Sequence, residues 1–144
     1  MKKFIVLSII LLMIAGFAIT SSAQELEVAI DIKPGSDPNS INLKSKGVIS
    51  VAILGSDTFD VALVDVDTLV FGPDYALPAH DLNDPLVYAD HLQDVNGDGF
   101  MDLVCHFRTQ ETGILPSAIS AMLTFDTTGG DHIEVYDSVN IVGK

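Results

Sequence analysis

The sequence predicts an all-β protein, an antiparallel β-sandwich that is immunoglobulin-like in outline. Short apolar runs rich in β-branched residues are separated by clusters of Gly, Pro, Asn, Asp and Ser, which favours strands joined by turns. Most of these runs alternate apolar and polar positions, and helical periodicity is scarce. The chain has no Trp and a single Cys, which excludes the tryptophan and disulfide of an antibody-type domain.

The first half of the domain is expected to hold three strands. Residues 26–33 (LEVAIDIK) alternate well and end at the turn cluster 34–39. A short strand is expected at 41–43. Residues 48–54 (VISVAIL) are apolar almost throughout, which predicts a central strand covered on both faces.

The second half of the domain is expected to continue in strands. A short strand at 68–71 is closed by a Gly-Pro pair. Residues 86–93 are predicted to form a strand, with a short helix as the alternative because Asp84 and Pro85 suit an N-cap and a first helical residue. The remaining strands are expected at 101–108, 119–125, 133–135 and 138–142.

The N-terminus has the pattern of a secretory signal peptide over residues 1–23. A short basic region precedes an apolar run over residues 4–19, and small residues then suit cleavage after Ala23. A retained membrane anchor is the alternative, but the run is short for a span of about 20 residues. The sequence therefore predicts a secreted protein, extracellular or periplasmic, with one domain over 24–144 and no membrane span in the mature chain.

The charge of the chain is strongly acidic. Its formal net charge is −13, and removal of Lys2 and Lys3 with the signal peptide would leave 5 basic and 20 acidic residues, a net charge of −15. A protein of this charge repels nucleic acid and anionic membrane surfaces, so neither is an expected partner.

One short segment, residues 94–102 (DVNGDGFMD), has the spacing of a calcium-binding loop. Calcium takes six to eight oxygen ligands, and a tightly curled chain delivers them from alternate positions. Gly99 stands at the sixth position, where the turn is sharpest. The oxygens at positions 1, 3, 5, 7 and 9 would come from Asp94, Asn96, Asp98, the carbonyl of Phe100, and Asp102. The predicted cofactor is Ca²⁺, since the loop offers no nitrogen or sulfur ligand for zinc or copper and suits Mg²⁺ less well.

The loop departs from a helix–loop–helix EF-hand. Position 12, which would be a bidentate Glu, is Cys105. Residues 101–108 alternate with period two, with Cys105 on the apolar face, so a strand rather than a helix is expected after the loop. A solvated Asp/Asn/Gly turn without an ion is the alternative, because these residues also favour turns for local reasons.

Two resemblances support this interpretation. DVNGDGFMDLVCHF resembles the calcium hairpins of the FG-GAP and VCBS repeat families, which implies the same five ligands. Those families repeat the hairpin around a propeller, whereas this chain has it once, so a propeller is not expected. Residues 30–47, 51–60, 71–74 and 107–114 resemble an uncharacterised module of bacterial secreted and surface proteins, which implies a single domain and no activity.

Two other groups of residues are candidate sites. Asp57, Asp60, Asp65, Asp67 and Asp74 form a second acidic cluster, but no Gly lies at the needed offset, so solvated carboxylates are expected. The four histidines are scattered. His91 and His106 flank the loop and could face each other, but two ligands fall short of the three that a catalytic zinc site needs.

The sequence thus predicts a secreted calcium-binding module of structural or adhesive type, with a surface protein or glycan as partner. A calcium-dependent carbohydrate- or protein-binding module is the alternative. A small secreted hydrolase is disfavoured, because the chain has no GxSxG, no HExxH and no phosphate-binding glycine loop.

Overall fold

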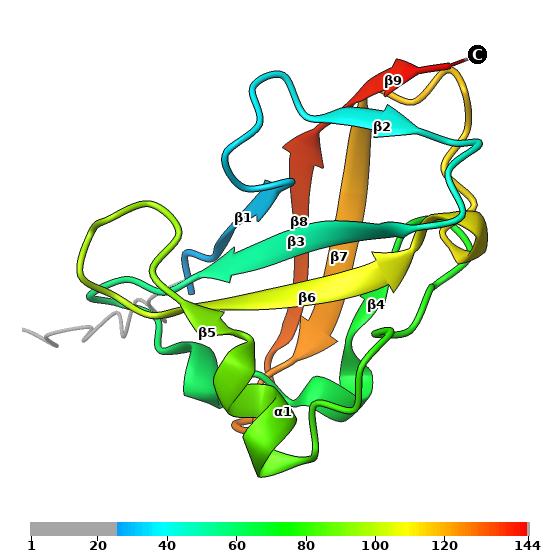
Figure 1. Ribbon diagram of the computed structural model, residues 1–144. Helices are drawn as coiled ribbons and strands as arrows, with labels where there is room; N and C mark the ends of the chain where they lie inside the picture. Colours follow the sequence, from blue (N-terminus) through cyan, green and yellow to red (C-terminus); the bar gives the residue numbers. More distant parts are fainter. Residues whose placement is uncertain (1–25, 144) are drawn as a thin grey trace, which may run out of the picture.

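The computed structural model describes residues 26–143, and it confirms the all-β class (Figure 1). The predicted signal peptide lies outside the described residues. The strands are β1 (Ala29–Ile32), β2 (Ser40–Asn42), β3 (Val48–Leu54), β4 (Val70–Phe71), β5 (Leu92–Gln93), β6 (Asp102–Arg108), β7 (Ser120–Asp126), β8 (His132–Ser138) and β9 (Asn140–Val142). One α-helix, α1 (Pro85–Asp90), and three 3₁₀ turns, η1 (Val61–Leu63), η2 (Val66–Thr68) and η3 (Thr109–Glu111), complete the described elements.

The strands form two antiparallel sheets and one parallel pair. The larger sheet has the order β1-β3-β6-β5, the second has the order β4-β7-β8, and β2 pairs with β9 in parallel. Figure 1 shows β3 and β6 in front of β7 and β8. The backbone N–H of Ile32 in β1 donates to Asp137 of β8 at 2.9 Å, which ties the two sheets together. The fold is thus sandwich-like, while the immunoglobulin-like outline stays a prediction.

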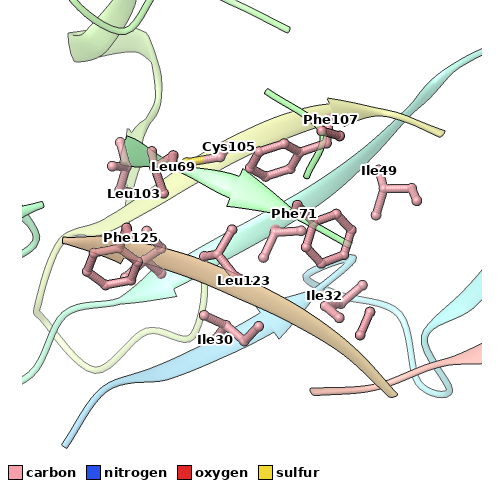
Figure 2. Packing of buried hydrophobic residues seen from close by; sticks show 14 of the residues in the cluster. Ile30, Ile32, Ile49, Leu69, Phe71, Leu103, Cys105, Phe107, Leu123 and Phe125 are labelled. Atoms are coloured by element: carbon pink, nitrogen blue, oxygen red, sulfur yellow. The ribbon is translucent and has the colours of Figure 1, made fainter. Parts of the chain in front are cut away.

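The hydrophobic core lies between the two antiparallel sheets (Figure 2). The rings of Phe71 in β4 and Phe107 in β6 lie 5.1 Å apart between centroids. The apolar face predicted for β6 is confirmed for Leu103, Cys105 and Phe107, which are fully buried. The predicted alternation is otherwise incomplete, because Met101 is exposed before the strand, and Asp102 and Val104 on the opposite face are buried as well. Burial also raises the pKa of the Cys105 thiol to about 12, so this cysteine is a small apolar core residue and not a reactive group.

The strand predicted over residues 86–93 was wrong for most of its length. Residues Pro85–Asp90 form α1, and β5 covers only Leu92–Gln93. The Asp84 side chain accepts a hydrogen bond from the Leu86 N–H at 2.9 Å, and Pro85 occupies the first turn, where its missing N–H costs nothing. The local cap therefore outweighs the apolar pattern. No helix among the described residues is long and apolar enough to cross a membrane.

Candidate metal centre

The predicted calcium loop connects two antiparallel strands, as the sequence suggested. Its two ends are held by the pairing of β5 with β6, in which Leu92 is opposite Leu103 and Gln93 is opposite Asp102. In Figure 1 the loop projects beyond the end of the larger sheet, between β5 and β6. The hairpin therefore presents the loop at the surface while its base is fixed in the sheet.

The first predicted ligand, Asp94, lies at the centre of a network of backbone amides. One of its carboxylate oxygens accepts hydrogen bonds from the N–H groups of Gly97 at 2.9 Å and Asp98 at 3.2 Å. The other accepts from the N–H of Gly99 at 2.9 Å. The Asn96 side-chain oxygen accepts from the Asp98 N–H at 3.3 Å. The loop backbone therefore curls around the Asp94 carboxylate.

The third predicted ligand, Asp98, continues the curl, because its carboxylate accepts from the Phe100 N–H at 2.9 Å. Gly97 and Gly99 have φ angles of +73° and +88°. Residues with a side chain rarely adopt this left-handed backbone conformation, so the two glycines allow the reversals of the chain that the curl requires. Added Cβ atoms at both positions would meet open space, so backbone conformation and not crowding selects glycine here.

The last predicted ligand, Asp102, is fully buried, whereas its place on the polar face of β6 suggested an exposed side chain. One carboxylate oxygen accepts from the Gly55 N–H at the end of β3, and the other from the Val95 N–H in the loop, both at 2.8 Å. A Cβ added to Gly55 would lie 2.2 Å from the carbonyl oxygen of Met101. Asp102 and Gly55 thus fasten the loop closely against the end of β3.

The loop carboxylates do not meet as a compact trio in this structure. Within residues 26–143, the one group of three or more His, Cys, Asp or Glu ligand atoms that all lie within 4.8 Å of one another is formed by His80, His91 and His106. Ligands on opposite sides of a calcium ion can lie about 5 Å apart, since Ca–O distances are about 2.3–2.6 Å. Carboxylates around a Ca²⁺ ion therefore need not all lie within 4.8 Å of one another.

A cleft of about 410 Å³ adjoins the loop. Asn96 and Asp98 contribute to its wall from the loop, and the turn after β3 contributes Asp57. The other lining residues are Glu27, Val28, Ala29, Leu54, Gly55, Ser56 and Thr58. The cleft is therefore acidic and shares two side chains with the predicted calcium site.

Three carboxylates of the second acidic cluster, those of Asp60, Asp65 and Asp67, make hydrogen bonds that stabilise nearby turns and loops. Asp60 accepts from the Ala62 N–H at 2.9 Å, and Asp65 accepts from the Asp67 N–H at 3.2 Å, so each caps a 3₁₀ turn. The Asp67 carboxylate accepts from the side-chain amide of Asn83 at 2.6 Å. These carboxylates form no compact ligand group in the described part of the chain.

The sequence predicted only part of the cluster formed by His80, His91 and His106. The sequence placed His91 and His106 on either side of the loop, but it gave no sign that His80 joins them. His80 lies between β4 and α1, and no sequence spacing relates it to the hairpin. His132 stands apart on β8, where hydrogen bonds from its ring to Asp126 at 2.6 Å and the nearby Glu134 raise its pKa.

Comparison with protein-family models, with curated proteins and with solved structures found no match to this chain. The resemblance of the loop to FG-GAP and VCBS hairpins, and of the longer segments to a bacterial surface module, therefore stays a prediction.

Proposed function

We propose that the protein is a calcium-binding module in which one Ca²⁺ ion seats in loop 94–102 and rigidifies the hairpin between β5 and β6. The observation that carries the proposal is the curl of the loop around Asp94, whose carboxylate accepts three backbone N–H groups. An ionised carboxylate has about four lone-pair sites, so oxygens that accept amides on one side keep lone pairs for a cation on the other.

The proposed ligands are Asp94, Asn96, Asp98, the Phe100 carbonyl and Asp102. Asp102 would have two roles. Its oxygens accept hydrogen bonds from the backbone N–H groups of Gly55 and Val95, and its remaining lone pairs would complete the calcium shell. Because Asp102 is fully buried and begins β6, calcium bound to it would be coupled directly to the sheet.

Charge supports a cation in this loop. Three carboxylates within nine residues repel one another, and the whole chain already carries a net charge of −13. A divalent cation relieves that repulsion in the folded state only, so it stabilises the fold. A ligand present at 100 times its Kd contributes about 2.7 kcal/mol to the free energy of unfolding.

We propose a binding role for this module and no catalytic one. Secretion, expected from residues 1–23, would expose the loop to extracellular calcium, where modules commonly bind with Kd values on the order of 10⁻⁴–10⁻³ M. A weak structural site would then be filled outside the cell and empty elsewhere. The module would become rigid where it meets a surface protein or glycan.

The test is a calorimetric titration of the purified full chain with Ca²⁺, beside the variants Asp98→Ala and Asp90→Ala. Asp90 is exposed at the end of α1 and controls for the loss of one nearby negative charge. We expect one Ca²⁺ per chain for the wild type and for Asp90→Ala, and no measurable binding for Asp98→Ala. Equal binding by Asp98→Ala, or none by the wild type, would contradict the proposal.

A second function, calcium-dependent binding of a carbohydrate or peptide, is favoured by one observation. The cleft of about 410 Å³ shares Asn96 and Asp98 with the loop, so calcium would fix two of its wall residues. A glycan array probed with and without chelator would test it. Signals that disappear with chelator and with Asp57→Ala, which changes a cleft residue outside the loop, would support the second function. Absence of such signals would leave the structural role alone.

A further inference from the structure

Three histidines from separate parts of the chain meet along one edge of β6. The centroids of the His80, His91 and His106 rings lie 4.9 to 5.3 Å apart. β3 pairs with the other edge of β6, whereas this edge is completed by β5 and by the segment leading from β4 to α1 (green in Figure 1). The Ala79 N–H of that segment donates to the His106 carbonyl at 2.7 Å, which places His80 beside β6.

His91 is fixed in orientation by a backbone contact. It follows α1 directly as the C-cap residue and is buried. Its ring Nδ1 lies 2.5 Å from the carbonyl oxygen of Val104, and the Val104 N–H donates to the His91 carbonyl at 2.8 Å. A carbonyl only accepts, so Nδ1 carries a proton, which leaves Nε2 as the ring nitrogen that can bind a metal. A ring oriented in this way by a carbonyl is the usual state of a metal-ligating histidine.

His106 lacks such a partner. Its Nδ1 is buried and makes no hydrogen bond, and a buried polar atom without a partner is costly. Burial, and then the neighbouring His91 and His80, lower the pKa of His106 and so favour its neutral ring. The contacts among the three rings include no hydrogen bond to this atom, whereas a cation bound between the rings would be a common partner for them.

We propose that His80, His91 and His106 bind one Zn²⁺ ion, each through one ring nitrogen. Three imidazoles suit zinc and neighbouring transition metals and do not suit Ca²⁺ or Mg²⁺, which prefer oxygen. The site is independent of the calcium loop, because it shares no ligand with it.

The distances allow the ion to be bound with a small adjustment. The three ligand atoms lie within 4.8 Å of one another. Zn–N bonds of about 2.0–2.1 Å at tetrahedral angles require nitrogens about 3.3 Å apart. His80 is exposed and lies on an irregular segment, so its ring can make most of this movement. Its exposure also leaves the fourth coordination position open to water or to another ligand.

Zinc at this place would join three elements at the base of the hairpin. His80 brings the segment after β4, His91 brings the end of α1, and His106 brings β6. The calcium loop occupies the tip of the same hairpin, so the two ions would fix it at opposite ends. The β6–β5 side of the larger sheet would then depend on both ions for its stability.

The test uses the purified full chain, stripped of metal and titrated with Co²⁺ as a spectroscopic probe for Zn²⁺ in saturating Ca²⁺. We expect visible absorption bands of tetrahedral Co²⁺ that reach a plateau at one equivalent and disappear when Zn²⁺ is added. His80→Ala should weaken binding by more than the roughly 10–100-fold that loss of an outer-shell partner costs. His80 is the chosen variant because it is exposed, whereas His91 is built into the fold.

The matched control is His132→Ala, since His132 lies on β8 beside two carboxylates and offers a rival site. It should bind Co²⁺ as the wild type does. The proposal is overturned if the wild type shows no tetrahedral bands, if His80→Ala binds as tightly as the wild type, or if His132→Ala abolishes binding. His106→Gln, which keeps a polar side chain in β6, should lose the bands while keeping the melting temperature of the metal-stripped protein.

Discussion

Replacing Asp102 with Asn tests how the loop is attached to the sheet. The substitution preserves size and removes the charge, and it turns one of the two carboxylate acceptors into an NH₂ donor. The N–H groups of Gly55 and Val95 both require an acceptor at this fully buried position. One of them would therefore face another donor and lose its hydrogen bond.

The expected cost follows from these two contacts. A hydrogen bond to a charged group contributes about 1.5–3 kcal/mol, and a buried donor left unsatisfied costs about 1–3 kcal/mol. Removal of a buried carboxylate offsets part of this loss. We expect Asp102→Asn to lower the free energy of unfolding by about 3 kcal/mol, which is about 10 °C in the melting temperature of a domain of this size.

The assay is thermal unfolding followed by circular dichroism in excess chelator, with Asp98→Asn and Asp90→Asn beside it. Asp102→Asn should melt well below the wild type even without calcium, because its backbone contacts do not need the ion. Asp98→Asn should differ from the wild type only when calcium is added, and Asp90→Asn should not differ. If Asp102→Asn melts within about 2 °C of the wild type in chelator, the attachment role is refuted.

Three further predictions concern other parts of the fold. Gly55→Ala should lower both the melting temperature and the calcium affinity, because its Cβ would lie 2.2 Å from the Met101 carbonyl oxygen and push the loop away; calorimetry would measure both. Cys105, whose pKa burial raises to about 12, should resist iodoacetamide in native buffer near neutral pH and react once urea unfolds the chain, with mass spectrometry as the readout. Burial, followed by repulsion from Asp137 and Asp102, raises the pKa of Asp31, so its ionised form costs stability above that raised value. Asp31→Asn should therefore melt slightly higher than the wild type near neutral pH, and this gain should vanish as the pH falls and the wild-type carboxyl takes up its proton.

The parts of the fold that were predicted correctly are those decided by burial of one face. In β6, Leu103, Cys105 and Phe107 recur with period two, and a strand places these three side chains together in the core, although Val104 between them is also apolar and buried. The apolar run of β3 likewise predicted a central strand, and β3 lies between β1 and β6.

The features that the sequence did not predict depend on a local helix cap or on pairing with a distant segment. Residues 86–91 are apolar enough for a strand, but the hydrogen bond from the Leu86 N–H to Asp84 starts a helix there instead. β2 pairs in parallel with β9, about 100 positions along the chain, and no sequence periodicity indicates such a partner.

The candidate sites likewise divide into features set by neighbouring residues, which the sequence predicts, and features set by distant contacts, which it does not. The calcium loop could be predicted because all five proposed ligands lie within nine residues, so spacing alone describes it. The burial of Asp102 could not, because its partner Gly55, which directly follows β3, is 47 residues away in the sequence. His80 joins His91 and His106 only through the packing of its segment against β6, which the sequence does not reveal.

The most direct test of the central claim is the melting temperature of the purified full chain in calcium, in equal magnesium and in chelator. Calcium at about 100 times its Kd should add about 2.7 kcal/mol, which corresponds to a rise of roughly 10 °C over chelator. Magnesium should give much less, because it demands a tighter octahedral shell than a flexible oxygen-rich loop offers. Identical melting temperatures in all three conditions would contradict the claim and leave residues 94–102 as an acidic turn.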